Sequence, residues 1–214
     1  MSRYVDRPTL HPRGFNESVA LPYGLRVSEI KAALDDIYDF LHNINRFLID
    51  RGWDRLEETL SAATFSGVMS ELFVEGVSKR SSTVIKNAYH NGRPDLVPIG
   101  YYENDAAHRG GEGIEVKASR WSNGWQGHNI EDGWIMICQY YVDLGTSPVE
   151  HRAPTCFDRI LCAKLEEADW SYSGRREGSR RTPTASIKRS GVTKLEANAV
   201  YADPSYKPRP KPKR

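Results

Sequence analysis

The sequence predicts an α/β domain, in which a central mixed β-sheet is flanked by helices and follows a helical N-terminal part. Residues 28–80 repeat apolar side chains at steps of three and four positions, the period of an amphipathic helix. From residue 83 onward, short runs rich in β-branched and aromatic residues alternate with glycine-containing turns. The 214 residues, 39% of them hydrophobic, can bury the core of one such domain. Helices followed by a run of strands favour an α/β or α+β arrangement.

The N-terminal part begins with an arm and continues with helices. Residues 1–27 show no periodicity and contain three prolines and two glycines, so we expect an irregular arm. A helix follows, which Ser28 can cap and Gly52 can close. Its apolar stripe consists of Ile30, Ala33, Leu34, Ile37, Leu41, Ile44 and Leu48.

Two further helical stretches follow this one. The first begins near Asp54, and the second covers residues 66–79, where an acidic residue, Glu71, stands among apolar neighbours. We expect the second helix to turn Val68, Leu72 and Val77 inward, with Met69 and Phe73 as further inward candidates.

The strands are expected after residue 83. Residues 83–89 are short and mixed, and Asn91-Gly92 is a strong turn signal. Residues 104–113 are polar and rich in glycine, which is typical of a loop. We expect strands at residues 96–102, 114–119, 134–142, 159–165 and 192–201.

The domain organisation follows from these elements and from the charge distribution. Residues 28–203 are expected to form one domain, with a helical part (28–80), a core (81–170) and a basic C-terminal part (171–203). Residues 204–214 alternate proline with lysine or arginine, so we expect a flexible, solvated tail. Residues 175–214 carry twelve basic and three acidic side chains, whereas the first 174 carry 18 basic and 25 acidic ones. The net charge of +2 therefore combines an acidic body with a basic end, a pattern typical of proteins with polyanionic partners.

Several classes of protein are not supported by the sequence. No apolar run reaches the roughly 20 residues that a membrane-spanning helix requires, and the N-terminus has no signal-type apolar stretch. The three cysteines form neither a disulfide framework nor a zinc-binding spacing, so we expect a cytoplasmic protein. The phosphate-binding loop of nucleotide hydrolases and the nucleophile elbow of serine hydrolases are both missing.

The chemistry is concentrated in Pro94-Asp95 and in Glu115-Val116-Lys117. Alternation along a strand places Glu115 and Lys117 on one face, and antiparallel pairing with the preceding strand brings Asp95 beside them. Mg²⁺ prefers carboxylate oxygens and keeps free positions for water and phosphate, so Asp95 and Glu115 are candidate ligands, with the Val116 carbonyl as a third. Lys117 could orient or deprotonate the attacking water, or stabilise the charge of the transition state.

At these residues the sequence resembles the PD-(D/E)XK nuclease superfamily, over about residues 60–145. The resemblance implies a restriction-endonuclease-like core with a central mixed sheet, and DNA cleavage that depends on Mg²⁺, for which Mn²⁺ can substitute. It also implies an acidic residue on the preceding helix, where Glu71 fits and Glu75, one turn later, is the alternative. A second interpretation of the motif stays open: Asp95 ends a proline turn, while Glu115 and Lys117 form an exposed cross-strand ladder.

DNA contacts are expected on both sides of this motif. Arg93 precedes it, and the segment after residue 118 is rich in side chains that hydrogen-bond bases and phosphates. The candidates in this segment are Ser119, Arg120, Asn123, Gln126, His128 and Asn129. Four further arginines, expected to contact phosphates, are Arg175, Arg176, Arg180 and Arg181. Structural alternatives stay open for both segments. The segment after residue 118 could be a surface loop anchored by two tryptophans, and the four arginines could belong to a solvated charged loop. Gln139 is either an auxiliary site residue or part of the strand packing.

The leading functional hypothesis is an Mg²⁺-dependent endodeoxyribonuclease acting on double-stranded DNA, of the type II restriction or another defence class. One alternative is a DNA-binding module whose nuclease site is vestigial, and another is a repair or RNA-cleaving nuclease on the same fold. The helical region 28–79 offers apolar surface for a homodimer, which would match a palindromic DNA site.

Overall fold

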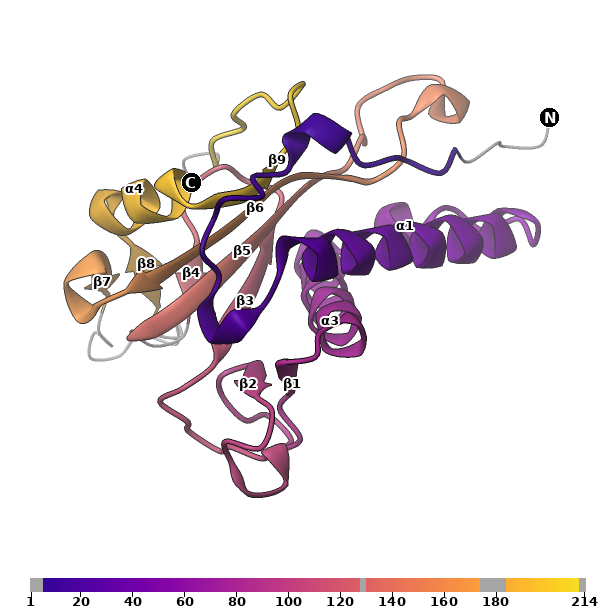
Figure 1. Cartoon of the computed structure of the whole chain (residues 1–214). Coiled ribbons are helices and arrows are strands. Elements are labelled where there is room, and N and C mark those ends of the chain that lie inside the picture. Colours follow the sequence, from indigo (N-terminus) through magenta and orange to yellow (C-terminus); the bar gives the residue numbers. More distant parts are fainter. Residues whose placement is uncertain (1–5, 128–129, 174–183, 212–214) are drawn as a thin grey trace, which may run out of the picture.

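A six-stranded mixed sheet forms the centre of the computed structural model, which describes residues 6–127, 130–173 and 184–211 (Figure 1). The strand order is β1–β2–β3–β5–β6–β9, in which β3 and β5 are parallel and the other neighbours antiparallel. The bounds are β1 (Val84–Lys86), β2 (Leu96–Pro98), β3 (Ile114–Ser119), β5 (Gly133–Tyr141), β6 (Cys156–Leu165) and β9 (Ala199–Ala202). The expected α/β class with a mixed central sheet and flanking helices is confirmed.

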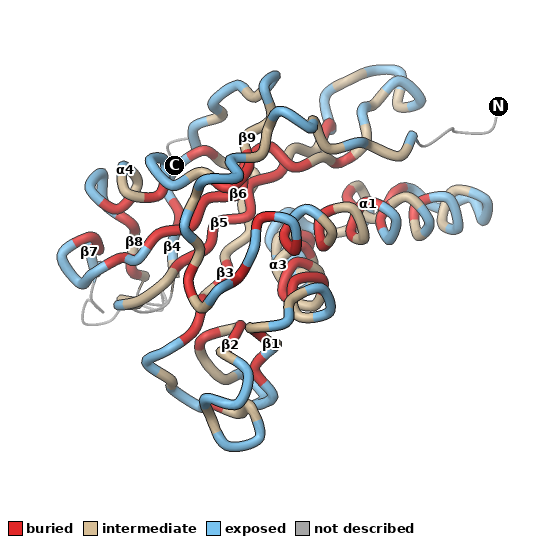
Figure 2. The backbone as a smooth tube through the Cα atoms, in the orientation of Figure 1, coloured by how far each residue is buried: buried red, intermediate tan, exposed pale blue. Residues whose placement is uncertain are grey.

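Each face of this sheet is covered by different elements (Figure 2). One face, with Val116 and Met136, packs on the helices α1 (Val27–Ile49) and α3 (Ala62–Arg80). The other face, with Ile135 and Leu161, packs on α4 (Arg189–Ala197) and on a small second sheet. That sheet consists of β4 (Gln126–Gly127), β8 (Ala185–Ile187) and β7 (Trp170–Tyr172). Because side chains alternate along β3, Glu115 and Lys117 lie on the second face.

The helices agree with the expected stripes only in part. In α1 the buried side chains include Ile30, Leu34 and Leu41, as the periodicity predicts, and α2 (Leu56–Thr59) is a single turn. In α3 the expected inward residues Met69, Phe73 and Val77 are buried, and Leu72 packs half-buried against the core. The prediction that Val68 points inward was wrong, since it is half-buried and does not join that core. The buried residues of α3 are Phe65, Met69, Phe73, Val74, Gly76 and Val77.

The face that α3 buries decides where its acidic residues lie. The buried stripe advances in four-residue steps through Phe65, Met69 and Phe73, so the larger side chains occupy the core. Glu71 therefore lies on the outer side, with 71% of its side chain exposed. The expectation of an inward acid among apolar neighbours was wrong, because apolar residues occur on both sides of this helix.

Two other predictions were also wrong. Residues 192–201 do not form one strand but the end of α4 followed by β9. The expected strand 96–102 is shorter, because β2 ends at Pro98 and Gly100 adopts a positive φ of 72°.

The expected arm and tail both pack on the sheet. Residues 6–26 are irregular apart from two short 3₁₀ turns, and the ring of Phe15 packs at a tilt against Tyr201 of β9, with 4.7 Å between ring centroids. In the tail, Arg209 forms an ion pair with the buried Asp158, and its carbonyl accepts the Ser122 N–H at 2.9 Å. Most residues of 204–211 are exposed, as expected of a solvated tail, but Tyr206 and Arg209 are half-buried against the domain.

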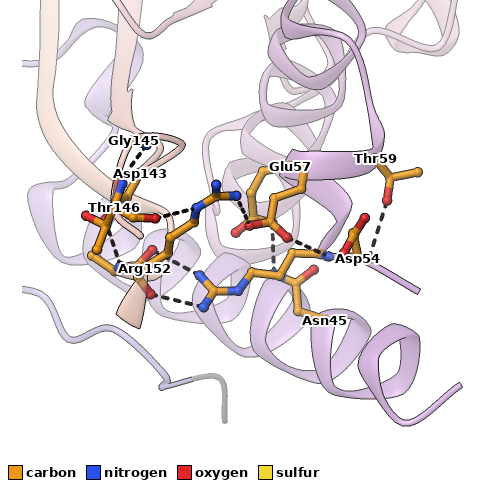
Figure 3. A network of polar contacts seen from close by, with 11 residues as sticks. Asn45, Asp54, Glu57, Thr59, Asp143, Gly145, Thr146 and Arg152 are labelled. Atoms are coloured by element: carbon orange, nitrogen blue, oxygen red, sulfur yellow. Dashed lines mark hydrogen bonds and ion pairs between the residues drawn. The ribbon is translucent and has the colours of Figure 1, made fainter. Parts of the chain in front are cut away.

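A polar network joins the helical part to the segment after β5 (Figure 3). Asn45 on α1 donates to Glu57 at 2.8 Å, and Arg152 pairs with Glu58 at 2.7 Å. Asp143 accepts the backbone N–H groups of Gly145, Thr146 and Ala153 at 3.1, 3.0 and 3.1 Å. The network fixes the two halves of the domain against each other through charged hydrogen bonds.

Asp143 makes this network sensitive to acid. Burial alone raises its pKa, but the hydrogen bonds from Thr146, Ala153 and Gly145 outweigh burial and lower the pKa to about 2. Because the folded pKa lies below the unfolded one, this stabilisation is complete above pH ~4 and lost as the pH falls through ~2. We expect the free energy of unfolding to decrease by about 2 kcal/mol over that range from this group alone. Urea unfolding at pH 2.5 and 5 should show a smaller decrease in Asp143→Asn; an equal decrease in both proteins would contradict the assignment.

No helix within the described ranges is both long and apolar enough to cross a bilayer. The outer side of the helical part does expose Phe40, Phe47 and Trp53, with 46%, 50% and 61% of each residue accessible. Pairing of two copies through this surface stays a prediction.

Candidate active site

The β2–β3 pair brings Asp95 beside Glu115. The strands pair at Leu96 and Ile114, so Asp95, one residue before β2, lies opposite Glu115, one residue into β3. The Oδ2 atom of Asp95 accepts the backbone N–H of Val116 at 2.7 Å. This bond fixes one carboxylate against the strand that carries the other, as the motif predicted.

Lys117 lies between two carboxylates on the same face of the sheet. Its Nζ atom is 3.3 Å from Glu115 Oε1 and 2.8 Å from Glu131 Oε2. These side chains are largely buried, with 15% of Lys117, 17% of Glu115 and 10% of Glu131 exposed. The alternative of an exposed cross-strand ladder is therefore wrong.

Sequence reasoning missed Glu131. This residue precedes β5, which runs parallel to β3 and begins beside it, with Trp134 opposite Ile114. Parallel neighbours start at the same edge of a sheet, so the residues before β5 lie near the first residues of β3. An acidic residue just before the strand that follows the motif was the available signal.

Burial and neighbouring charge raise the pKa of two of these carboxyl groups, Asp95 and Glu131. The pKa of Asp95 is raised to about 7, mainly by burial and then by the charge of Glu115, while the Val116 N–H and Lys117 act in the opposite direction. The pKa of Glu131 is raised, again mainly by burial. Burial lowers the pKa of Lys117, but Glu115 and Glu131 together raise it above its usual value. In this arrangement Lys117 is a fixed cation, and Asp95 is partly protonated at neutral pH.

Two neighbouring cavities give access to these groups. The larger, about 570 Å³, is lined by Glu71, Lys86, Arg93, Asp95 and Glu115, among others. The smaller, about 320 Å³, shares Arg93 and Glu115 with it and extends to Glu131. Glu115 thus lies where both cavities meet. Arg93, with 41% of its side chain exposed, lies 3.6 Å from Glu131 and can reach a ligand in either cavity.

Glu71 shares the larger cavity but is not part of the acidic pair. Its carboxylate is 2.9 Å from Lys86 Nζ, whereas Glu75 pairs with Lys79 at 3.2 Å and does not line the cavity. Within residues 6–127, 130–173 and 184–211, no three His, Cys, Asp or Glu side chains come together as a metal-binding set.

The oxygen donors available to a cation are accordingly few. The donors nearest to the acid pair are the carboxylates of Asp95 and Glu115 themselves and the carbonyl of Val116, which accepts the Ser70 hydroxyl at 3.4 Å. Two hard carboxylates that repel each other, with room for water and phosphate, fit Mg²⁺, which takes one or two protein carboxylates.

The segment before β2 is held in place by Asn87. This buried amide donates to the carbonyls of Pro94 and Ala107 at 2.9 and 2.8 Å, and accepts from the N–H groups of Tyr89 and Ala107 at 3.0 and 2.9 Å. Its own backbone N–H donates to the Asp95 carbonyl at 2.9 Å. Gly92 is required nearby, because a Cβ there would overlap the Ala107 carbonyl. The sequence contained no signal for this role of Asn87.

The segment after β3 is occupied by contacts within the protein. Ser119 accepts the Trp121 N–H at 3.1 Å, which shapes a turn. Asn123 accepts the Lys211 N–H at 3.1 Å, and Gln126 donates to Ser186 at 3.1 Å. Arg120 is half-buried beside Trp121 and Arg209, along a further cavity.

Trp125 is buried and donates to the Trp121 carbonyl at 3.0 Å, so the loop is anchored by its tryptophans, as the structural alternative held.

The remaining candidates lie elsewhere. Gln139 is fully buried and accepts from Arg159 at 2.9 Å, so it takes part in the strand packing. His128, Asn129 and the arginines at 175, 176, 180 and 181 lie outside the described residues.

Comparison of the chain with models of known protein families, with curated proteins and with solved structures finds no match. A functional assignment therefore depends on the geometry around Asp95, Glu115 and Lys117 and on the motif that they form.

Proposed function

We propose that the protein is an Mg²⁺-dependent endodeoxyribonuclease of the restriction-endonuclease-like class. The observation that carries the proposal is the convergence of Asp95 and Glu115 beside the buried cation of Lys117, at the junction of two cavities. Like charges held together in a low-dielectric site are costly, and they are typical of sites that receive a metal ion.

Each residue has a role in this proposal. Asp95, Glu115 and the Val116 carbonyl would hold the metal, which when bound would acidify a water and stabilise the negative charge developing on the phosphate oxygens. Lys117, fixed as a cation, orients that water and interacts with the developing negative charge. Glu131 keeps Lys117 in position, and Arg93 binds a phosphate oxygen.

The basic C-terminal part and the exposed arginine of the site support DNA as the partner, because phosphate contacts dominate nucleic-acid affinity. Restriction or another defence role, and a cytoplasmic location, belong to the same proposal.

A second candidate is a DNA-binding module with a vestigial nuclease site. Two observations favour it: Glu71 is paired with Lys86, and the described part of the chain contains no set of three His, Cys, Asp or Glu side chains that could hold a metal. This module would bind DNA in a salt-dependent way without cutting it.

Incubation of the purified protein with supercoiled plasmid and Mg²⁺ tests the proposal. We expect cleavage that EDTA stops, that Mn²⁺ restores, and that falls on the order of 10³-fold in Glu115→Gln, since the metal contributes several kcal/mol. Glu167→Gln is the matched control, because Glu167 is an exposed acid before β7, away from both cavities, and should leave cleavage unchanged.

Modified and unmodified plasmids should both be used, and the cut ends sequenced to separate nicking from double-strand cleavage. Salt-sensitive binding without cleavage on any of them would favour the vestigial module. Equal cleavage by wild type and Glu115→Gln would contradict the site.

A further inference from the structure

An exposed pair of aromatic rings stands on the rim of the larger cavity. Tyr89, which lines this cavity, is 46% exposed, and its ring lies 4.9 Å from that of His108 with an interplanar angle of 38°. The two residues belong to the 87–113 lobe, the part of the chain between β1 and β3 that contains β2, and its loops lie below β1 and β2 in Figure 1. His90 and Asn91, next to Tyr89, are exposed as well.

The backbone that carries the two rings is held by hydrogen bonds. The backbone N–H of Tyr89 donates to Asn87, and its carbonyl accepts the Gly92 N–H at 2.9 Å. The His108 carbonyl accepts the Arg93 N–H at 3.2 Å, so His108 is tied to the segment that leads into Asp95. A ring pair fixed in this way loses little conformational freedom when a ligand stacks on it.

The surroundings of the pair are complementary to a nucleic acid. Arg93 and the exposed Arg109 lie on adjacent backbone that forms a β-bridge, and both line the smaller cavity. Exposed aromatic rings beside cationic side chains are the means by which proteins bind single strands, since bases stack on the rings while the cations contact phosphates. A paired base inside a duplex already has both faces stacked, so a protein ring can stack only on a terminal or unpaired base.

We propose that Tyr89 and His108 form a stacking platform for an unpaired nucleobase, and that the strand to be cut is therefore single-stranded or locally unpaired DNA at the cavity. This inference rests on the proposed function and narrows its substrate class. The stacked base lies next to the phosphate that faces Asp95 and Glu115. Tyr89 acts through its ring face, and its hydroxyl is dispensable.

Binding without cleavage tests the platform directly. The full chain in EDTA is titrated into a labelled single-stranded oligonucleotide, and into the same sequence within a blunt hairpin, with fluorescence anisotropy as the readout. Stacking contributes about 1–3 kcal/mol per base, so we expect Tyr89→Ala to bind the single strand roughly 5- to 150-fold more weakly. Tyr89→Phe should bind as wild type does.

Tyr101→Ala is the matched control. Tyr101 is a more exposed tyrosine (62%) of the same lobe, packs edge-on against Tyr102, and does not line the cavity. We expect its removal to leave binding unchanged. A single 2-aminopurine in the oligonucleotide adds a spectroscopic signature, because its fluorescence should be quenched by wild type and Tyr89→Phe but not by Tyr89→Ala.

The outcomes separate this inference from the proposed function. Equal single-strand binding by wild type and Tyr89→Ala, or binding to the hairpin alone, overturns the platform even if the protein cleaves DNA. Tyr89-dependent binding and quenching without cleavage supports the platform and contradicts the nuclease. Equal melting temperatures of the three variants show that lost binding is not lost folding.

Discussion

Asp95→Asn is expected to abolish DNA cleavage and to raise the melting temperature of the metal-free protein at pH 8. Cleavage should fall on the order of 10³-fold, because a metal ligand is lost. Stability should rise because burial and the charge of Glu115 disfavour the ionised form of Asp95, raising its pKa to about 7. The asparagine oxygen can still accept the Val116 N–H, so the bond that fixes the strand is retained.

The sign of the pH dependence follows from the raised pKa. Between pH ~4 and ~7 the folded state binds more protons at Asp95 than the unfolded state does, so stability falls as the pH rises. Asp95→Asn has no carboxyl group to ionise at this position, so its stability does not decrease in this way as the pH rises. We expect its free energy of unfolding at pH 8 to exceed that of wild type by about 2 kcal/mol. For a chain of 214 residues, this corresponds to a rise of roughly 4–8 °C in melting temperature.

Thermal unfolding in EDTA at pH 4 and pH 8 provides the measurement. The difference in melting temperature between Asp95→Asn and wild type should be large at pH 8 and small at pH 4. In place of EDTA, Mg²⁺ should reduce this difference at pH 8, because it binds and stabilises wild type. Asp132→Asn, which removes an exposed carboxylate of the smaller cavity, serves as the control and should change the melting temperature little. A lower melting temperature of Asp95→Asn at pH 8 would show that the acid pair is not strained.

Lys117→Met is expected to be strongly destabilising as well as inactive. The methionine fills a similar volume but leaves Glu115 and Glu131 without the cation that lies between them. Removing one partner of a buried ion pair costs about 3–5 kcal/mol, and the slight exposure of these groups places the expected cost near 3 kcal/mol. Cleavage should fall on the order of 10²- to 10³-fold, the usual effect of losing one charge-stabilising group.

A double-mutant cycle isolates the pair. Because Glu131→Gln removes one of the two uncompensated charges, the double variant should recover more than half of the stability lost in Lys117→Met. Lys86→Met is the matched control, since Lys86 pairs with the exposed Glu71 at 2.9 Å and such surface pairs contribute about 1 kcal/mol or less. Urea unfolding at pH 7 measures the free energy of unfolding of wild type and of each variant. Additive effects of Lys117→Met and Glu131→Gln would contradict the proposed coupling.

The sequence was sufficient to predict the parts of the site that depend on local geometry. Asp95 directly precedes β2 and Glu115 lies in the antiparallel neighbour β3, so strand alternation and one loop determine their convergence. Strand β3 was predicted with its observed bounds. Glu131 depends instead on the parallel pairing of β3 with β5, a non-local choice that alternation cannot reveal.

Other parts of the structure depend on competition between residues. The orientation of Glu71 followed from which stripe of α3 is buried, and Phe65 and Phe73 decided this against Val68. The tail was predicted to be solvated from its composition, but Arg209 has a buried partner, Asp158, on a distant strand. An ion pair with a buried partner therefore holds Arg209 against the domain, although the proline- and lysine-rich composition of its segment predicts a solvated chain.

The buried amide of Asn87 has a consequence for how such a domain can diversify. Its side chain hydrogen-bonds the backbone of Tyr89, Pro94 and Ala107. The Tyr102 hydroxyl makes a second tie, to the backbone N–H and carbonyl of Glu112 at 2.8 and 3.0 Å. Residues 99–101 lie beyond both ties and expose Ile99 and Tyr101. We therefore expect changes confined to this tip to leave Asp95 in register with Glu115, so the length of this loop can vary without moving the acid pair.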